Sequence, residues 1–174
     1  MAAKRQKPTK PYVFVSYSTR EPHVQLLIDC LHIVFAPYYD VRLTPHALES
    51  GASQRQAIID LACNCSFAVV ALDGLRPNVV FEYGLLEAKD RPVLLFKETN
   101  AEVDIRGFFR DPPQLGVTSV AIDLNTQFSD VKDVNYASWN RFSIQQTVKV
   151  IWDEYKKKRT KIQPRFNIPE PKLW

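Results

Sequence analysis

Residues 66–96, SFAVVALDGLRPNVVFEYGLLEAKDRPVLLF, contain two short apolar segments on either side of a segment long enough for a helix. The first apolar segment, Ser66–Leu72, is rich in apolar and β-branched residues, which is typical of a strand buried on both faces. Asp73-Gly74 ends it, and the proline that follows opens a predicted helix over residues 77–89. The second apolar segment, Val93–Phe96, predicts another buried strand.

The same alternation of strand and helix patterns continues in both directions along the chain. The further expected strands are Tyr12–Tyr17, Tyr38–Leu43 and Val117–Leu124. The further expected helices are Glu21–Phe35, Ser53–Asn64 and Trp139–Lys158, which carry apolar residues at helical spacing. Strands that alternate with helices favour a parallel sheet covered by helices on both faces, so we expect a doubly wound α/β fold.

The length of the chain fits one domain. Its 174 residues can bury a sizeable core, whereas two complete domains would be a tight fit. The two ends differ from the middle in composition, because the first is basic and the last is rich in proline and basic residues. We therefore divide the chain into a basic tail at residues 1–10, a folded domain at 11–158 and a second tail at 159–174.

The net charge of +4 is unevenly distributed along the chain. Residues 1–10 contain four basic and no acidic residues, and residues 155–174 contain seven basic residues and one acidic residue. Residues 11–154 contain 12 basic against 18 acidic residues, so the expected folded part is acidic. A nucleic-acid-binding fold would carry positive charge on its own surface, and we therefore expect no direct nucleic-acid binding.

Several classes of protein are disfavoured by what the sequence lacks. No apolar run approaches the roughly 20 residues that span a bilayer, and none follows the basic N-terminus at the spacing of a secretion signal. The three cysteines form no disulfide framework, and neither they nor the three histidines have the spacing of a metal site. The five glycines include no phosphate-binding loop. We therefore expect a cytoplasmic protein without a metal or a membrane partner, and no kinase, NTPase or Rossmann dehydrogenase.

Polar residues near the carboxyl ends of the expected strands are candidates for ligand binding, because ligands of parallel α/β sheets bind at that edge. For several of them an ordinary structural role is the alternative. Ser18 can cap a helix, Arg20 can be a surface residue and Asp73 can form a turn. Asn78 can belong to the first turn of its helix. The candidate substrate-binding residues are Ser16, Tyr17, Ser18, Arg20, Thr44, Asp73 and Asn78.

Glu82 differs from an ordinary surface glutamate because its helical neighbours offer it no ion pair. The residues three and four positions before and after it include no Lys or Arg, whereas Glu87 has Arg91 four positions later. Two explanations remain open at this point. The carboxylate can be stabilised near the positive end of its helix, or it can face a cleft at the carboxyl edge of the sheet and contact a ligand.

Two segments of the chain resemble motifs of one protein family. Tyr12–Ser18 is similar to the first strand of Toll/interleukin receptor-like (TIR-like) domains, whose usual form is aromatic-Ile-Ser-Tyr-Ser. Residues 77–84, PNVVFEYG, followed by RPVLL at 91–95, resemble the Asn-Val-x-(Phe/Tyr)-Glu-Leu-Gly segment of bacterial TIR-like nucleotide-binding proteins. The family pattern has Leu after the Glu, where this chain has Tyr83. The resemblance extends over about residues 11–155.

The resemblance implies a flavodoxin-like sheet of five parallel strands. It also implies that Glu82 matches the catalytic glutamate of TIR enzymes that cleave the nicotinamide–ribose bond of NAD. Cleavage of an N-glycosidic bond passes through an oxocarbenium-like state that a carboxylate can stabilise, and nicotinamide is already a cationic leaving group. The resemblance therefore implies a NAD hydrolase or cyclase, with NAD as its substrate and no separate cofactor.

The same resemblance implies a biological setting and partners. It points to an effector of bacterial antiphage immunity or cell-death signalling that acts when copies assemble through TIR–TIR contacts, with a sensor or activator protein as a further partner. Two alternatives stay open. One is a non-catalytic interaction domain, whose signalling would survive a substitution of Glu82. The other is a nucleoside deoxyribosyltransferase-like enzyme, which would exchange the base of free nucleosides instead of consuming NAD.

Overall fold

The computed structural model describes residues 10–44, 54–100, 102–104, 119–121, 135–164 and 168–172. Strands and helices alternate from β1 to β4, as the apolar pattern predicts. The strands are β1 (Tyr12–Ser16), β2 (Asp40–Leu43), β3 (Phe67–Ala71), β4 (Val93–Glu98), β5 (Glu102–Asp104), β6 (Ser119–Ala121) and β7 (Ala137–Trp139). The helices are α1 (Val24–Phe35), α2 (Gln54–Asn64), the 3₁₀ turn η1 (Asp73–Leu75), α3 (Pro77–Ala88) and α5 (Ile144–Ile162).

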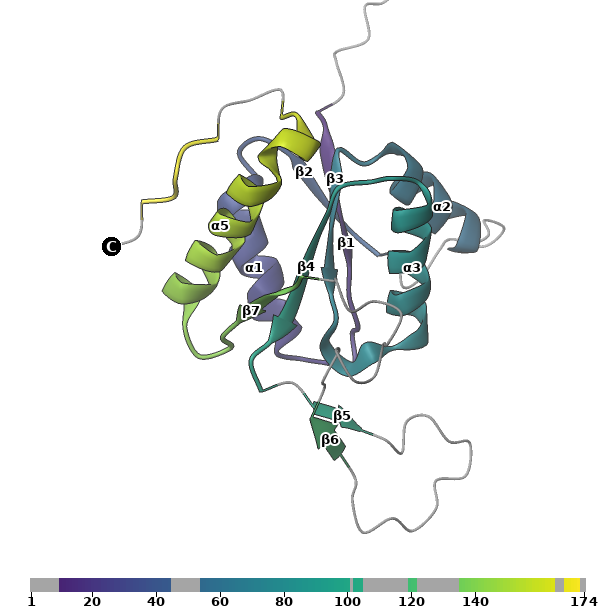
Figure 1. Cartoon of the computed structure of the whole chain (residues 1–174), viewed down its shortest axis with the longest axis vertical. Coiled ribbons are helices and arrows are strands. Elements are labelled where there is room, and N and C mark those ends of the chain that lie inside the picture. The colour runs from purple at the N-terminus through teal and green to yellow at the C-terminus, as the bar shows by residue number, and fades with distance from the viewer. Residues whose placement is uncertain are drawn as a thin grey trace, which may run out of the picture.

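Five of the strands form one parallel sheet in the order β2-β1-β3-β4-β7 (Figure 1). Val15 of β1 is paired with Leu43 of β2 on one side and with Val69 of β3 on the other. The strand order therefore reverses at β1, which creates the topological switch point of a flavodoxin-like fold between β1 and β3. The predicted fold class, a doubly wound α/β sheet of five parallel strands, is confirmed.

Helices cover both faces of the sheet, with α1 and α5 on one side and α2 and α3 on the other (Figure 1). β3 and β4 lie inside the sheet, and every residue of both strands is buried. Successive side chains point to opposite faces, so that Val69 packs in the core beside α1 and α5 while Val70 packs in the core beside α2 and α3. This double burial explains why β3 and the first four residues of β4, Val93–Phe96, are apolar without alternation.

Phe67 is central to the core beside α1 and α5. Its ring centroid is 5.2 Å from that of Phe35 on α1 and 5.9 Å from that of Tyr155 on α5. Edge-to-face and tilted ring pairs of this kind add about 0.5–1.5 kcal/mol each to the free energy gained by burial. One side chain of β3 therefore contacts both helices that cover this face.

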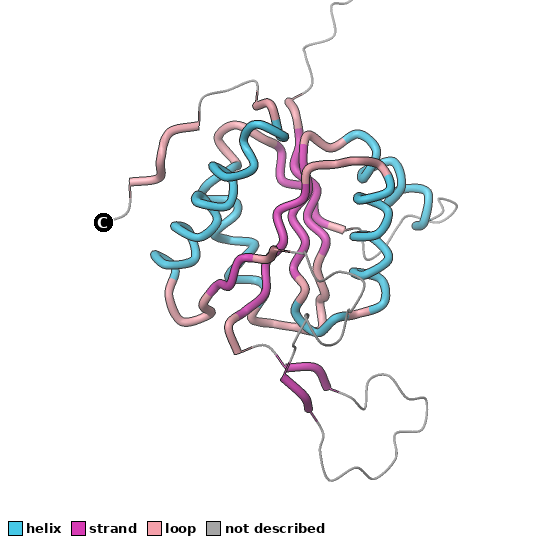
Figure 2. Tube along the Cα trace, viewed as in Figure 1, coloured by secondary structure: helices cyan, strands magenta, loops and turns pink. Residues whose placement is uncertain are grey.

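The fifth strand of the sheet is not the segment that the apolar pattern predicted. Of the expected strand at residues 117–124, the structure describes only β6, which pairs antiparallel with β5 and not with the main sheet. Figure 2 shows β5 and β6 beyond the carboxyl edge of that sheet. The fifth position is taken by β7, in which Ser138 is paired with Lys97 of β4. Trp139, which was expected to begin the last helix, instead ends this strand.

The C-terminal part of the chain contributes to the core. α5 continues to Ile162, beyond the expected end at Lys158, and the buried side chain of Ile162 packs in the core beside α1 and α5. Ile168 belongs to the same core and is only 3% exposed. The segment that was expected to be a Pro-rich tail therefore includes two core residues.

Parts of the predicted organisation lie outside the described residues. They include residues 1–9 of the basic N-terminal tail and residues 45–53, which connect β2 to α2. Among the helices that the structure does describe, none combines the length and the apolar character needed to cross a membrane.

Candidate functional site

Glu82 lies on the face of α3 that packs against the sheet. The buried residues of this helix are Val79, Glu82 and Leu86, which are three and four positions apart and therefore form one stripe. Val79 and Leu86 belong to the apolar core beside α2 and α3, and Glu82 between them is only 1% exposed. Because Pro77 is the first residue of the helix, Glu82 is the sixth, beyond the first turn to which the helix dipole acts. The helix end therefore does not explain the buried carboxyl group.

Two hydroxyl groups from neighbouring strands surround the carboxyl group of Glu82. Thr44, directly after β2, places its Oγ1 2.9 Å from Glu82 Oε2. Ser16, the last residue of β1, is close enough for its hydroxyl to lower the pKa of Glu82, although no hydrogen bond of good geometry joins the two groups. Ser16 is 0% and Thr44 is 3% exposed. Since β1 and β2 are parallel, both contacts lie at the carboxyl edge of the sheet, where such folds bind their ligands.

The surroundings of Glu82 favour the neutral form of its carboxyl group. Burial raises the pKa of Glu82 above its ordinary value, and the hydroxyl groups of Thr44 and Ser16 oppose this shift only in part. No charged side chain of the described residues contributes to the shift. The second oxygen, Oε1, is buried and has no hydrogen-bond partner in the described part of the chain. The described residues of the site therefore offer one carboxyl group among hydroxyl groups, and they include no cation that holds it ionised.

Three other candidate residues, Ser18 and Arg20 after β1 and Asn78 at the start of α3, do not lie beside the Glu82 carboxyl group. Ser18 is buried, and its Oγ accepts the backbone N–H of Arg20 at 3.2 Å, so it supports the turn after β1. The helix cap expected of Ser18 is not formed, because α1 begins only at Val24. The side chains of Arg20 and Asn78 are exposed at the surface. The structure does not bring these three residues into contact with the Glu82 carboxyl group.

Tyr17 and Asp73 are associated with the other face of the sheet. Tyr17 is partly buried against the core beside α1 and α5, and burial raises the pKa of its phenol. Asp73, directly after β3, is fully buried. Its Oδ1 accepts the backbone N–H of Glu98 at 2.9 Å and lies 3.4 Å from His23 Nε2, whereas its Oδ2 is buried without a hydrogen-bond partner among the described residues. Asp73 therefore belongs to a second buried polar cluster.

Glu98 is the other fully buried carboxylate of this cluster. Its Oε2 accepts two hydrogen bonds, one from Nη2 of Arg141 at 2.9 Å and one from the backbone N–H of Asn100 at 2.7 Å. Burial by itself raises the pKa of Glu98, but Arg141 and Asn100 lower it more, so the resulting pKa lies below the ordinary value. Glu98 also raises the pKa of Arg141. Together with Asp73, this pair joins the carboxyl ends of β3 and β4 to the turn after β7.

Three members of the second cluster were absent from the sequence-based candidates: His23, Glu98 and Arg141. Glu98 had a recognisable signal, because it is an acidic residue at the carboxyl end of a clearly predicted strand. Arg141 had none, because the strand that precedes it was not predicted. His23 lies in the connection between β1 and α1, where the sequence does not show which strand end its ring will meet.

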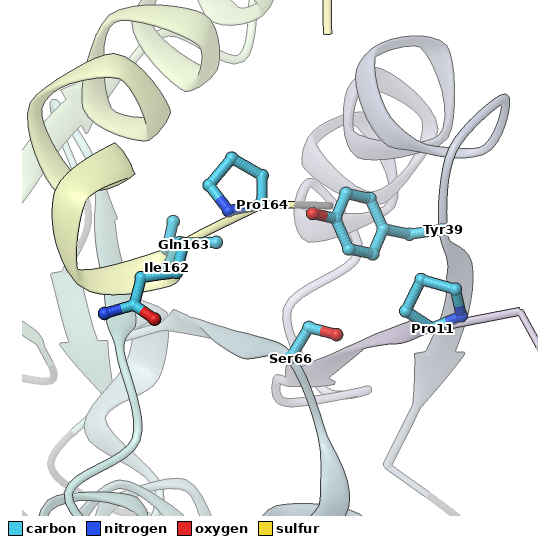
Figure 3. A pocket seen from close by; sticks show the side chains of 6 residues that line it. All are labelled: Pro11, Tyr39, Ser66, Ile162, Gln163 and Pro164. Atoms are coloured by element: carbon cyan, nitrogen blue, oxygen red, sulfur yellow. The ribbon is translucent and has the colours of Figure 1, made fainter. Parts of the chain in front are cut away.

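A cavity of about 210 Å³ lies at the opposite, amino edge of the sheet (Figure 3). Its lining residues come from positions before the first three strands and from the end of α5: Pro11, Tyr39, Ser66, Ile162, Gln163 and Pro164. The length of the strands separates it from Glu82, so it is not part of the candidate site. Within the described ranges, no group of three or more His, Cys, Asp or Glu side chains is arranged to hold a metal ion.

No protein family model and no curated protein matches the sequence. Solved structures with a similar fold include two examples. One is the CMP N-glycosidase BcmB of Clostridium botulinum, with 12% sequence identity and a TM-score of 0.48 over 80% of this chain and 97% of that chain. The other is the TIR domains of the activated Roq1 resistosome, which directly recognises the pathogen effector XopQ, with 13% identity and a TM-score of 0.49 over 84% of this chain and 98% of that chain. At such low identity neither likeness carries a conclusion about activity.

Proposed function

We propose that this chain is a TIR-like NAD nucleosidase that cleaves the nicotinamide–ribose bond, with Glu82 as its catalytic residue. The observation that supports this proposal is the position of the Glu82 carboxyl group. It lies at the carboxyl edge of the sheet beside the switch-point strand β1, on the motif that resembles NAD-cleaving TIR enzymes. Its neighbours among the described residues are hydroxyl groups and not cations. An ordinary structural ion pair does not account for a carboxyl group in such surroundings.

The proposed chemistry requires one carboxylate. When the bond between nicotinamide and C1′ of the ribose breaks, the electron pair leaves with nicotinamide and positive charge develops on the sugar. An ionised Glu82 stabilises that charge or accepts hydrogen bonds from the ribose hydroxyl groups. Water then attacks C1′ and releases a proton, which gives ADP-ribose; attack by a nucleophile within the substrate would give the cyclic product instead. No second acid is needed, because nicotinamide departs as a neutral molecule.

The conformation described here is closed, because Glu82 is only 1% exposed. Substrate binding therefore requires the carboxyl edge of the sheet to open above this residue. We propose that assembly of copies of the chain, with an activator as a further partner, opens the site, and that the role is that of a cytoplasmic effector in bacterial antiphage immunity or cell death. The resemblance of the two sequence motifs supports this part of the proposal.

The same burial favours a second candidate function. A carboxyl group that stays closed to solvent in every state would fit a non-catalytic interaction domain, in which Glu82 only fixes α3 against β1 and β2. The two functions differ in what a substitution of Glu82 does. In the interaction domain, Glu82→Gln keeps the hydrogen-bonding shape and leaves signalling intact, whereas in the enzyme it removes the charge on which turnover depends.

The deciding experiment incubates the full chain with NAD over a series of protein concentrations and separates the products by chromatography. We expect nicotinamide and ADP-ribose or its cyclic form, and a loss of at least about 100-fold in turnover for Glu82→Gln, the order found when one transition-state-stabilising group is removed. Glu87→Gln is the matched control, because Glu87 is exposed on the same helix. A parallel incubation with free nucleosides tests for base exchange. Equal NAD turnover by the wild type and Glu82→Gln would contradict the proposal.

A further inference from the structure

The hydroxyl group of Thr44 has more acceptors around it than it has hydrogens. Its Oγ1 lies 2.9 Å from Glu82 Oε2 and 3.1 Å from the carbonyl oxygen of Val15. The same carbonyl oxygen also accepts the backbone N–H of Thr44 at 2.9 Å, which fixes the position of Thr44 against β1. A threonine hydroxyl has one hydrogen, so it can point that hydrogen at the carboxyl group or at the carbonyl oxygen, but not directly at both.

Two arrangements of hydrogens are compatible with these distances. In the first, Glu82 is ionised and accepts the hydrogen of Thr44, so the close contact between Thr44 Oγ1 and the Val15 oxygen holds no hydrogen. In the second, Glu82 is protonated and donates to Thr44 Oγ1, which donates its own hydrogen to Val15. Only the second arrangement places a hydrogen in both contacts.

The rest of the site also favours the second arrangement. An ionised Glu82 would hold a full charge at 1% exposure, with Oε1 buried and without a hydrogen bond of good geometry to any described residue. Burying a carboxylate without a cation or a set of donors is costly, and such a group becomes neutral instead. The elements around Glu82 supply two hydroxyl groups, Ser16 at the end of β1 and Thr44 after β2, and no described charged group acts on the carboxyl from α2, α3 or either strand.

We infer that Glu82 is protonated in the closed site, where it donates its carboxyl hydrogen to Thr44 Oγ1, and that the Thr44 hydroxyl donates its own hydrogen to the carbonyl oxygen of Val15. Thr44 is then a positioning residue and not a substrate ligand. When the site opens, Glu82 releases its proton to solvent, and a rotation of the Thr44 hydroxyl about one bond turns it from acceptor into donor towards the new carboxylate. The inferred protonation state of Glu82 does not depend on the proposed function. Its consequence for catalysis does rest on that function: the closed chain would be inactive because the carboxyl group of Glu82 is neutral.

Infrared difference spectroscopy, in which the spectrum of each variant is subtracted from that of the wild-type full chain, tests this inference without any substrate. At neutral pH ordinary Asp and Glu side chains are ionised, so a carbonyl band of a protonated carboxylic acid reports a buried neutral group. We expect this band in the wild type and not in Glu82→Gln. Thr44→Val should keep the band but move it to a higher wavenumber, because the acid loses its hydrogen-bond acceptor. Thr44→Ser keeps a hydroxyl group, so its band should lie at the wild-type position.

A wild-type spectrum that shows only ionised carboxyl groups at neutral pH would overturn the inference, as would a Thr44→Val spectrum identical to that of the wild type. A sample labelled with carbon-13 at the glutamate side-chain carboxyl gives the protonation state by NMR without a substitution, in case a variant does not fold. The outcome is separate from that of the NAD experiment. Turnover without the protonated band would reject only this inference, and the band without turnover would reject only the proposed activity.

Discussion

Glu82 and Glu87 lie on the same helix, but their surroundings differ. Glu87 is exposed, whereas Glu82 is enclosed between the sheet and α3 with two hydroxyl groups beside it. Burial raises the pKa of Glu82, so the folded chain binds this proton more tightly than the unfolded chain does. The resulting stabilisation is complete below the ordinary pKa of 4.5 and is lost as the pH rises through the raised value in the folded state.

The direction of this pKa shift predicts how Glu82→Gln changes the free energy of unfolding with pH. The glutamine is neutral at every pH, so the variant should gain stability relative to the wild type as the pH rises above the ordinary carboxyl pKa and through the raised pKa of Glu82 in the folded chain. Thermal unfolding followed by circular dichroism at several pH values measures the difference. Glu87→Gln should show no comparable trend, and a wild type that becomes more stable than Glu82→Gln with rising pH would contradict the prediction.

At the scale of single residues, the sequence was informative about Glu82 and less so about its neighbours. The absence of a helical ion partner singled out Glu82, and the strand ends predicted Ser16 and Thr44 beside it, as the structure shows. The roles of these residues in catalysis and binding stay predictions. Arg20 and Asn78 are exposed, because proximity to a strand end along the chain does not fix where a side chain points.

At the scale of elements, the pair Glu98–Arg141 connects β4 to the turn that leads from β7 into α5. Glu98 is 0% exposed, so replacing Arg141 with glutamine leaves a buried carboxylate without its cation. We expect Arg141→Gln to lower the free energy of unfolding by about 2–3 kcal/mol, somewhat below the usual cost of breaking a buried pair because Arg141 is 30% exposed. Urea unfolding measures this loss, and a double-mutant cycle with Glu98→Gln isolates the pair.

The pH dependence and a control sharpen this prediction. Because the pKa of Glu98 is lowered in the folded chain, the contribution of the pair is present above the ordinary carboxyl pKa and is lost as the pH falls through the lowered value. The penalty of Arg141→Gln should therefore shrink in acid. Arg42→Gln is the control, because its pair with Asp40 is exposed and should be worth less than about 1 kcal/mol. Equal losses in the two variants would refute the assigned role.

The apolar pattern predicted four of the five sheet strands and missed β7 for a physical reason. β7 has three residues, Ala137–Trp139, and its middle residue Ser138 is exposed. So short a segment has no period to detect, and its pairing depends on β4 and on the helix that follows it. The segment at residues 117–124 is longer and more apolar, so local pattern favoured it over the strand that completes the sheet.

At the scale of the whole molecule, the core beside α1 and α5 extends to the C-terminal segment through Ile168. We expect Ile168→Ala to lower the free energy of unfolding by about 2–4 kcal/mol, the usual range for truncating a buried isoleucine. For a chain of this size each kcal/mol corresponds to about 2–4 °C in Tm. Lys172→Ala, which truncates an exposed side chain of the same segment, should change the free energy by less than about 0.5 kcal/mol. A loss no larger than that control would show that the segment does not belong to the folded unit.

The sheet has short strands at both of its margins, with four residues in β2 and three in β7. Margins of this length offer few free N–H and C=O groups to an incoming strand, and natural proteins use such short borders to prevent unwanted growth of a sheet. Pairing between the edge strands of two copies of this chain would therefore form few hydrogen bonds and would stabilise an assembly little. Self-association of the kind proposed above would have to use helix surfaces or loops, and it would leave the hydrogen-bonding ladder of each copy as it is in the monomer.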